Sequence, residues 1–539
     1  MKGKRMAIVA ILILLFVLVL FLPGYWLSEA NAAGTFPSLK SVAADNGILV
    51  GVNDDHFNTP YFNNTIPPNF DSVTPGNRME FKNIHPCPPE WMLTPTDPDY
   101  SKSVTDWVIA HGDLPPIGQH DDYDCWIAYA EEDEWEWGGV TTGTTGLMNW
   151  AGENNVGVYM TPLVWYLEDA LPPWLDEDTV ITSTISLSLA ARERLMEDHI
   201  KTIISQYCSF QRDDGEYTVY AADIVNEAFD SNGTIREVGI WWEISDFIDK
   251  AYRFADEARM GCLPSPRPDL KLMYNDFGFE YDGYTGAKVT GMIAYLDPLI
   301  DNGMPLDGIG FQTHLFYDPY ATDPAAPHNF SQLTATMSRI NRELGVEVKI
   351  TEVDVTFWDS TYYDRPIVYP LAATGVQTYY VPQAEVFAEI AWACIVVNEV
   401  STRNGFPGCT GYTIWGTNDQ DTWRYWWMRN SRGISETLAI TYLEYLDPLL
   451  FWDRNDKLWN PSKSACITPV LNPRRPTTTY SYCPKPAYYR VYDMFAAPLP
   501  PWPWPETIFL PLISHEEVEV FTGPYPPPPS APFAPPAYP

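Results

Sequence analysis

Basic residues are scarce in this chain of 539 residues, which carries 33 Lys and Arg against 70 Asp and Glu and a net charge of −37. Such a charge would be repelled by a nucleic acid or by an anionic membrane surface, so we expect neither as a partner. A neutral polymer is compatible with it. Aromatic residues are abundant by contrast, with 21 Trp and 33 Tyr. They would suit surfaces that stack on sugar rings, although a Trp-rich core would give the same excess.

The eight cysteines include no C-x-x-C pair, which argues against zinc or thioredoxin-type chemistry. If the chain is exported, the cysteines become candidates for disulfides. Spacing alone does not fix their connectivity, so the pairing stays open. Plausible pairs are Cys394 with Cys409, Cys466 with Cys483, and Cys87 with Cys125.

Long apolar runs are missing from the chain except near its beginning. Residues 6–22 are all apolar, follow a basic segment, and precede an A-x-A pattern at residues 30–32. This layout is typical of a secretory signal peptide over residues 1–33, with residues 34–47 as a linker. The apolar stretch is long, so an uncleaved anchor that tethers the chain to a membrane or cell surface is the alternative. Either reading predicts an exported protein.

No internal repeat stands out, and the end of the chain differs from the rest in composition. Residues 498–539 contain segments such as "GPYPPPPSAPFAPPAYP". A segment so rich in Pro does not add to a packed core, and we predict an extended or disordered tail.

Between residues 48 and 497, strand-like runs alternate with helical ones. The expected strands are 47–53, 70–75, 156–165, 220–226, 270–276, 306–314, 347–355 and 409–416. The expected helices include 188–207, 240–259, 287–303, 330–344 and 381–400. Such alternation implies a parallel sheet with crossover helices. Eight strands favour an α/β fold that closes into a (β/α)₈ TIM barrel, with loop insertions on its catalytic face and the longest at about 87–138.

The active site of such a barrel lies at the carboxyl ends of its strands. The polar and aromatic residues at or just beyond these ends are Asn226, Glu227, Gln312, His314, Glu352, Asp354, Trp415 and Trp423. Two carboxylates in a cleft lined with Trp are what cleavage of a glycosidic bond needs. Either Glu taken alone is better read as a helix start or a salt bridge, but the joint pattern favours catalysis.

Four segments in this order, "DIVNEAF", "GIGFQTHL", "ITEVDV" and "YTIWGTNDQDTW", resemble glycoside hydrolase family 10, the endo-β-1,4-xylanases. "FDSVTPGNRMEF", "TPLVWYLEDALPPW", "LMYNDFGFE" and "PKPAYY" resemble further motifs of that family, so the likeness spans about residues 48–495. The resemblance implies a secreted, retaining β-glycoside hydrolase that cleaves xylan by double displacement. It implies no metal or organic cofactor, and we expect a monomer.

By this resemblance, Glu227 matches the general acid/base and Glu352 matches the nucleophile. Glu227 must carry a proton before the first step, so its pKa is expected to lie above that of the second carboxylate. His314 matches the residue that bonds the nucleophile, with Asp354 behind it. The remaining matches are supporting or substrate-binding positions: Asn77, Trp165, Trp174, Asn226, Gln312, Trp415 and Trp423.

The second and third strand motifs depart from the family pattern. Gly76 stands where the family has Glu, Glu80 where it has Lys, and Thr161 and Tyr166 where it has His. Part of the sugar site on the non-reducing side of the cut is therefore rewritten, which favours a changed specificity, with drift as the alternative. Arg78 or Lys82 could compensate, but neighbouring residues on a strand point to opposite faces.

A second route to compensation is the insertion, whose tryptophans could rebuild the missing sugar contacts: Trp91, Trp126, Trp135 and Trp137. A small core packed on the barrel flank is the alternative use for them. Two other functions stay open at this point. One is the same mechanism on another β-linked glycan or glycoside, and the other is a carbohydrate-binding protein that has lost catalysis.

Overall fold

The structure is a computed structural model that describes residues 38–53, 60–85, 144–167, 170–172, 175, 188–282, 286–317, 330–357, 377–416, 452–453, 467–472, 475–484 and 486–497. The expected signal peptide, the insertion at about 87–138 with its four tryptophans, and the Pro-rich tail all lie outside these residues.

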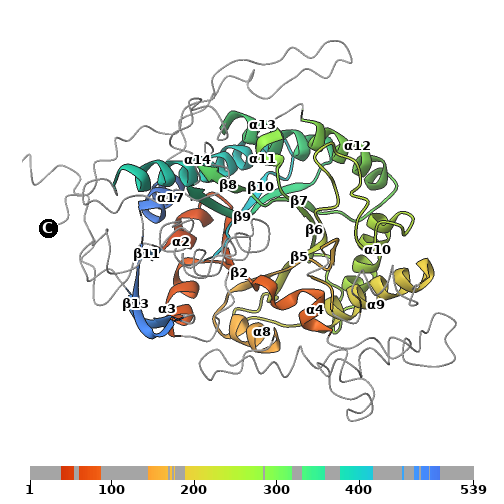
Figure 1. The fold of residues 1–539 in the computed structure, drawn as a ribbon, viewed down its shortest axis with the longest axis horizontal. Helices are drawn as coiled ribbons and strands as arrows, with labels where there is room; N and C mark the ends of the chain where they lie inside the picture. Colours follow the sequence, from red (N-terminus) through yellow and green to blue (C-terminus); the bar gives the residue numbers. More distant parts are fainter. Residues whose placement is uncertain are drawn as a thin grey trace, which may run out of the picture.

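Eight parallel strands form a closed barrel (Figure 1). In order around the ring they are β1 (Leu49–Asn53), β2 (Ser72–Thr74), β3 (Gly157–Met160), β5 (Val219–Asn226), β6 (Lys271–Asp276), β7 (Gly308–Phe311), β9 (Glu347–Phe357) and β10 (Cys409–Ile414). The ring closes because β1 pairs with β10 in parallel, with Leu49 opposite Gly411. The expected (β/α)₈ barrel is thus confirmed.

Two short strands extend the barrel at its carboxyl end. β4 (Val164–Trp165) pairs with β5, and β8 (His314–Tyr317) pairs with β9. Each follows a barrel strand after a break of two or three residues. These breaks let residues beyond the end of β3 and β7 stay beside the neighbouring strand, where the candidate catalytic residues lie.

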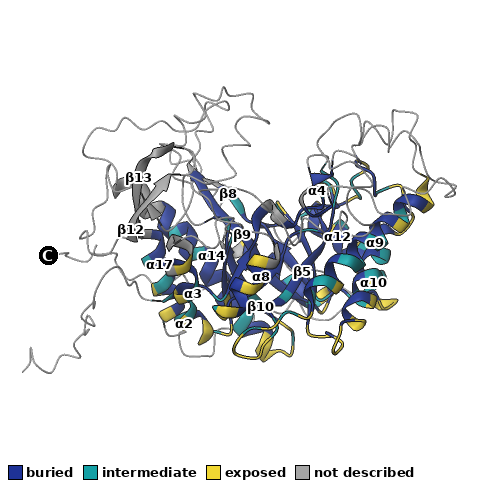
Figure 2. Cartoon of the chain, turned by 90° about the horizontal axis from the view of Figure 1, so that it is seen from below, coloured by how far each residue is buried: buried dark blue, intermediate teal, exposed yellow. Residues whose placement is uncertain are grey.

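Helices surround the barrel and bury their inner faces on it (Figure 2). They are α2 (Leu39–Ala44), α3 (Pro60–Asn69), α4 (Phe81–Ile84), α8 (Thr144–Glu153), α9 (Leu189–Tyr207), α10 (Phe247–Met260), α11 (Phe279–Asp282), α12 (Ala287–Asp301), α13 (Phe330–Glu343), α14 (Gln377–Arg403) and α17 (Pro486–Ala496). A 3₁₀ turn, η1 (Gly76–Met79), precedes α4. In Figure 2, α4 lies on the same rim as β8, which marks the carboxyl ends of the strands.

One expected helix was placed wrongly at its beginning. Residues 240–259 were expected to be helical, but α10 begins only at Phe247. Asp246 before it has a left-handed backbone with φ 57°, and such a residue does not continue a right-handed helix. The seven residues from 240 to 246 form turns instead.

A small antiparallel sheet near the end of the described chain was not expected. It consists of β11 (Trp452–Asp453), β12 (Ile467–Asn472) and β13 (Arg475–Pro484). The β13 segment reads "RPTTTYSYCP", and Thr and Tyr favour strands although Pro does not.

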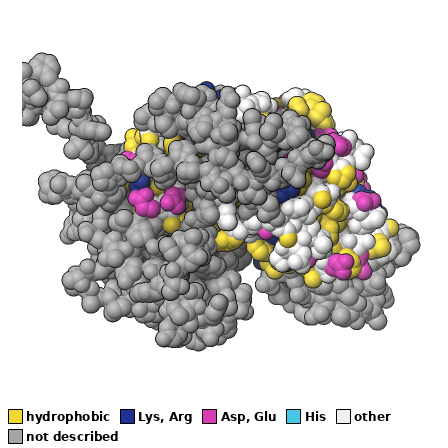
Figure 3. Space-filling view, turned by 90° about the horizontal axis from the view of Figure 1, so that it is seen from above, with side chains coloured by type: hydrophobic (Ala, Val, Ile, Leu, Met, Phe, Trp, Pro, Cys, Tyr) yellow, Lys and Arg dark blue, Asp and Glu magenta, His cyan; other side chains and the backbone are white. Residues whose placement is uncertain are grey.

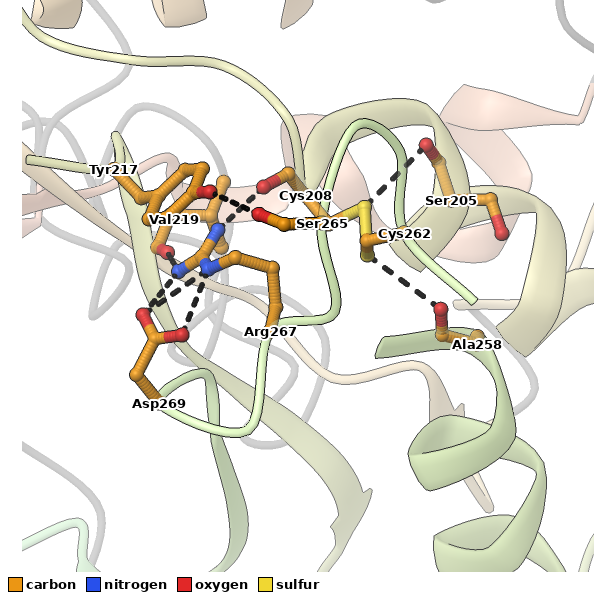
Figure 4. The surroundings of a disulfide bond; sticks show 9 residues. All are labelled: Ser205, Cys208, Tyr217, Val219, Ala258, Cys262, Ser265, Arg267 and Asp269. Carbon is orange, nitrogen blue, oxygen red and sulfur yellow. Dashed lines mark hydrogen bonds and ion pairs between the residues drawn. A yellow bond between two sulfur atoms is a disulfide. The ribbon is translucent and has the colours of Figure 1, made fainter. Parts of the chain in front are cut away.

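Disulfides join helices to the barrel and to each other. Cys394 on α14 is bonded to Cys409 at the start of β10, as expected. Cys208, directly after α9, and Cys262, two residues after the end of α10, form a bond that was not expected from the sequence (Figure 4). The other expected pairs lie outside the described residues or on a side chain that the structure does not describe.

A buried arginine near this second disulfide anchors the start of β5. Arg267 donates to the carbonyl oxygens of Cys208 and Val219, and its guanidinium forms an ion pair with Asp269 (Figure 4). The same guanidinium lies 3.6 Å from the ring centroid of Tyr217. The two helix ends and the first residue of β5 are therefore fixed together, which holds the strand that carries Glu227.

Candidate active site

Glu227 directly follows β5 and adopts a left-handed backbone with φ 55°. This conformation is uncommon for a residue other than Gly and needs support from its surroundings. The N–H of Glu227 donates to the carbonyl oxygen of Asn275 at 2.9 Å. Its own carbonyl oxygen accepts from Nε of Arg236 at 3.1 Å. The peptide is thus held on both sides, and the side chain is only 8% exposed.

The carboxyl group of Glu227 lies in surroundings that favour its protonated form. Its pKa is raised to about 6: burial and the charges of Asp276 and Glu352 raise it, and hydrogen bonds from Gln312 and Trp165 oppose the shift. Nε2 of Gln312 donates to Oε1 at 2.8 Å. At mildly acidic pH this side chain therefore holds a proton that it can donate.

Asn226 lies beside Glu227 at the end of β5. In the amide orientation that satisfies both of its ends, its nitrogen donates to the carbonyl oxygen of Asn275 at 3.0 Å, and its oxygen accepts from Nε1 of Trp165 at 3.3 Å. The strand β4 supplies Trp165, which pairs with Asn226 across the two strands. The indole N–H is thus shared between Asn226 and the carboxyl group of Glu227.

Glu352 lies within β9 and receives donors on both carboxylate oxygens. Nδ2 of Asn275 donates to Oε1 at 2.6 Å, and Nε2 of His314 lies 3.1 Å from Oε2. Thr351 donates to Oδ1 of Asn275 at 2.6 Å, which fixes the Asn275 amide with its nitrogen toward Glu352. A carboxylate that accepts from two fixed donors is oriented for attack on an electrophilic carbon.

His314 connects Glu352 to a buried aspartate. Its Nδ1 lies 3.1 Å from Oδ2 of Asp354, which is fully buried. Burial lowers the pKa of His314, but the charges and hydrogen bonds of Asp354 and Glu352 outweigh it and raise this pKa to about 9. An imidazolium at neutral pH then donates to both carboxylates. The centroid of the Trp415 ring lies 6.3 Å from that of the His314 ring, and the two rings meet edge-to-face.

The structure therefore brings six of the other candidate residues together around Glu227 and Glu352: Trp165, Asn226, Gln312, His314, Asp354 and Trp415. Trp174 and Trp423 lie outside the described residues. Asn77 lies in η1, and its side chain is not described. The roles of these residues stay predictions.

Sequence reasoning missed Asn275, which contacts both halves of the site. The signal was present, because Asn275 and Asp276 form a polar pair at the end of the expected fifth strand, as Asn226 and Glu227 do after the fourth. Both residues lie within the family-like segment "LMYNDFGFE".

The positions that depart from the family pattern lie on the same rim. Glu80 precedes α4 and is buried, and Nζ of Lys82 lies 3.0 Å from its Oε2. The expectation that residues 76–84 alternate between the two faces of a strand was wrong, because residues 76–79 and 81–84 form helical turns. Lys82 can therefore reach back to the carboxylate of Glu80.

Thr161 and Tyr166 occupy the two positions where the family pattern has His. Thr161 is 2% exposed, and its Oγ1 has no hydrogen-bond partner among the residues that the structure describes. Tyr166 is partly exposed, and the guanidinium of Arg236 lies 4.6 Å from its ring centroid. Burial and then the charge of Glu227 raise the pKa of the Tyr166 phenol, so this residue faces the candidate acid.

A search of the described residues for three or more His, Cys, Asp or Glu that could together hold a metal ion finds no such group. Likewise, none of the described helices is both long and apolar enough to cross a membrane.

Comparison with known proteins places this geometry in a family. A β-1,4-xylanase of Dictyoglomus thermophilum is 27% identical over 459 residues, which cover 84% of this chain and 96% of that protein. An endo-1,4-β-xylanase 1 of Humicola insolens is 28% identical over 277 residues, about half of each chain.

Solved structures share the fold. Native xylanase 10B of Thermotoga maritima has a TM-score of 0.52 and 22% identity, and the match covers 85% of this chain and 98% of that one. Xylanase 10B of Thermotoga petrophila, solved with xylobiose, has a TM-score of 0.53 at 22% identity, and covers 86% and 98%. The sequence model of glycosyl hydrolase family 10 matches residues 126–442, more than half of the chain. Together with the barrel and its paired glutamates, this match shows that the chain belongs to glycosyl hydrolase family 10.

Proposed function

We propose that this protein is an endo-1,4-β-xylanase that cleaves xylan with retention of anomeric configuration. The observation that carries the proposal is the contrast between the two glutamates. Glu227 is buried with a raised pKa, whereas Glu352 accepts hydrogen bonds from Asn275 and His314. Paired carboxyl groups with opposed surroundings suit acid/base and nucleophilic roles in glycoside hydrolysis. The similarity to proteins named xylanases supports xylan as the substrate.

The reaction follows from these positions. Glu227 protonates the glycosidic oxygen while Glu352 attacks the anomeric carbon, so the leaving sugar departs as an alcohol and a glycosyl ester forms on Glu352. Glu227, now a carboxylate, takes a proton from water, and the resulting hydroxide attacks the same carbon and releases Glu352. Two inversions at one carbon give net retention.

The test is hydrolysis of xylohexaose by the purified protein beside Glu352→Ala and a panel of other β-1,4-linked oligosaccharides. Release of shorter xylo-oligosaccharides, abolished by the substitution, supports the proposal. Cleavage of another panel member but not of xylohexaose would show that the substrate is that other glycan and not xylan. Absence of cleavage across the panel would favour a carbohydrate-binding protein.

A second candidate is the same reaction on a different β-linked glycan. The observation in its favour is the hydroxyl of Thr161, which is buried and lacks a partner among the described residues, together with the Glu80–Lys82 ion pair. A site whose hydrogen-bonding groups differ discriminates strongly between hydroxyl patterns. The oligosaccharide panel separates the two candidates.

We also propose that the protein is exported. The basic and apolar N-terminal segment supports export, and so do the disulfides Cys208–Cys262 and Cys394–Cys409, since such bonds persist in oxidising compartments. Fractionation of the producing cells, with N-terminal sequencing of the isolated protein, tests both export and cleavage. A full-length chain in the membrane fraction would favour the anchor.

A further inference from the structure

A buried ion pair lies directly behind the candidate acid. Asp276 ends β6 and is fully buried, and Lys288, in the first turn of α12, is 4% exposed. Nζ of Lys288 lies 2.7 Å from Oδ1 of Asp276. Burying two charges carries a desolvation cost that often cancels their attraction, so fold stability alone does not account for such a pair.

The surroundings of Asp276 are those of an ionised carboxylate. Besides Lys288, its oxygens accept from the N–H of Phe277 at 2.8 Å and from the hydroxyl of Tyr274 at 2.6 Å. Burial raises the pKa of Asp276 above its usual range, and Lys288 and these donors limit the rise. Three donors converge on one carboxyl group, which favours its charged form.

A short chain of hydrogen bonds connects Asp276 to the peptide that follows Glu227. The hydroxyl of Tyr274 donates to Asp276 and accepts from the N–H of Ala228 at 3.0 Å. Ala228 is the residue after Glu227, whose own N–H is held by Asn275 between Tyr274 and Asp276. The end of β6 therefore fixes the left-handed turn that presents Glu227.

Other groups face Glu227 from the elements around it. Gln312, directly after β7, and Trp165 on β4 are neutral donors, and Glu352 on β9 is the second carboxylate. The Tyr166 phenol lies beside it, and Arg236 donates to its main-chain oxygen. Among the charges that raise the pKa of Glu227, that of Asp276 outranks that of Glu352.

The groups around Asp276 are compatible with a negative charge on its carboxylate. Lys288 is its ion-pair partner and Tyr274 is neutral, because burial raises the pKa of that phenol far above the usual range. Glu280 on α11 faces Lys288 and His314, but burial raises its pKa to about 7, so it is largely protonated at mildly acidic pH.

We propose that Asp276 is a positioning residue for acid catalysis: through Tyr274 it fixes the peptide after Glu227, and its negative charge keeps Glu227 protonated until the leaving group departs. This inference rests on the proposed glycoside hydrolase function and adds to it a residue that does not touch the substrate. A purely structural ion pair is the alternative.

The test compares Asp276→Asn with the wild-type protein in the pH dependence of kcat/KM on two substrates. Xylohexaose has a poor leaving group that needs a proton from Glu227, whereas a 2,4-dinitrophenyl β-xylobioside has a leaving group that does not. Loss of the negative charge lowers the pKa of Glu227, so the alkaline limb for xylohexaose moves down by about one pH unit. The dinitrophenyl substrate keeps its rate at every pH.

Two further variants keep the test decisive. Asp276→Asn with Lys288→Met removes both charges and avoids an unpaired buried ammonium, and the same downward movement of the limb is expected. Glu343→Gln, which removes a carboxylate from a surface ion pair with Arg339 on α13, is the matched control and leaves the limb in place.

An unmoved alkaline limb would overturn the inference, and so would an equal loss on both substrates at every pH. Failure of both Asp276 variants to fold would establish a structural pair and overturn it as well. A wild-type protein that cleaves neither substrate would count against the proposed function, which is a different result.

Discussion

Gly310 on β7 lies so close to Asn275 on β6 that a Cβ at Gly310 would come within 2.4 Å of the Asn275 side-chain oxygen. The strands pair at this point, with Asn275 opposite Gly310. Asn275 needs this space because its amide nitrogen reaches Glu352 while its oxygen accepts from Thr351. The absence of a side chain at Gly310 is thus a condition for the orientation of the candidate nucleophile.

Gly310→Ala is therefore expected to displace the Asn275 amide and to reduce kcat on xylohexaose by about tenfold or more, because a misplaced nucleophile reacts slowly. The measurement is steady-state kinetics, with circular dichroism to verify folding. Gly411→Ala on β10 is the matched control, since the atoms nearest to its Cβ belong to the flexible side chain of Lys349, at 3.3 Å. Equal kinetic losses in the two variants would contradict the role of this space.

The assignment of the two glutamates predicts opposite products when azide replaces the missing carboxylate. In Glu227→Ala, azide attacks the glycosyl ester on Glu352 and gives a β-glycosyl azide from an activated aryl substrate. In Glu352→Ala, azide takes the place of the nucleophile and gives the α-azide. Nuclear magnetic resonance of the products separates the anomers. The reverse pattern would exchange the two roles.

Asp354→Asn should lower the pKa of His314, because the carboxylate that holds the imidazolium is gone. In the wild-type protein this pKa is raised to about 9. The stabilisation linked to this shift is fully present below the unfolded pKa and fades as pH rises through about 9. Urea unfolding at pH 6 and pH 9 should therefore show a larger loss in the variant at pH 6.

Nitrogen-15 spectra of the His314 ring give a direct check on the same variant. The wild-type ring should keep both N–H protons through neutral pH, and the variant ring should lose one at a lower pH. Identical titration of the ring in both proteins would show that Asp354 does not control the charge of His314.

The two disulfides should differ in their contribution to stability. Cys208–Cys262 closes a loop with a sequence separation of 54, and Cys394–Cys409 one of 15. On a chain-entropy account, replacing the first pair by Ala lowers the free energy of unfolding by about 4 kcal/mol, and the second by about 3 kcal/mol. Guanidinium unfolding under non-reducing conditions measures both. A larger loss from the shorter loop would show that the entropy of the unfolded chain does not decide the difference.

Much of the barrel was predictable because each strand is an apolar run that ends in polar residues. The strand over residues 220–226 and the helix over 188–207 agree with β5 and α9 almost to the residue. These predictions rested on the spacing of apolar residues, because a helix that faces the core and a buried strand each show a characteristic apolar pattern. It could not place the start of α10, where the left-handed Asp246 overrides an apolar pattern that would suit a longer helix.

The candidate site was predictable residue by residue where a side chain ends a strand, and less so where contact depends on neighbouring strands. Asn275 contacts Glu227 through its main chain and Glu352 through its side chain, and this double contact depends on the stagger of β5, β6 and β9. The Cys208–Cys262 bond had a readable signal, because both residues lie within two positions of the ends of helices that are neighbours in the barrel. That signal required the helix ends to be known first.

The pairing of β1 with β10 has a consequence for how the chain acquires its fold. Leu49 and Gly411 lie opposite each other where β1 pairs with β10 and closes the ring. The ring therefore cannot close until the last strand has been synthesised. A growing chain that lacks β10 carries an open sheet with two unpaired edges, a state that invites association with other strands. Ribosome-bound chains that end before residue 409 should therefore be digested readily by protease, and chains that expose β10 outside the ribosome should resist. Protection of the shorter chains would mean that the open sheet is already stable. We therefore expect the chain to become protected from aggregation only after nearly the whole barrel has been synthesised.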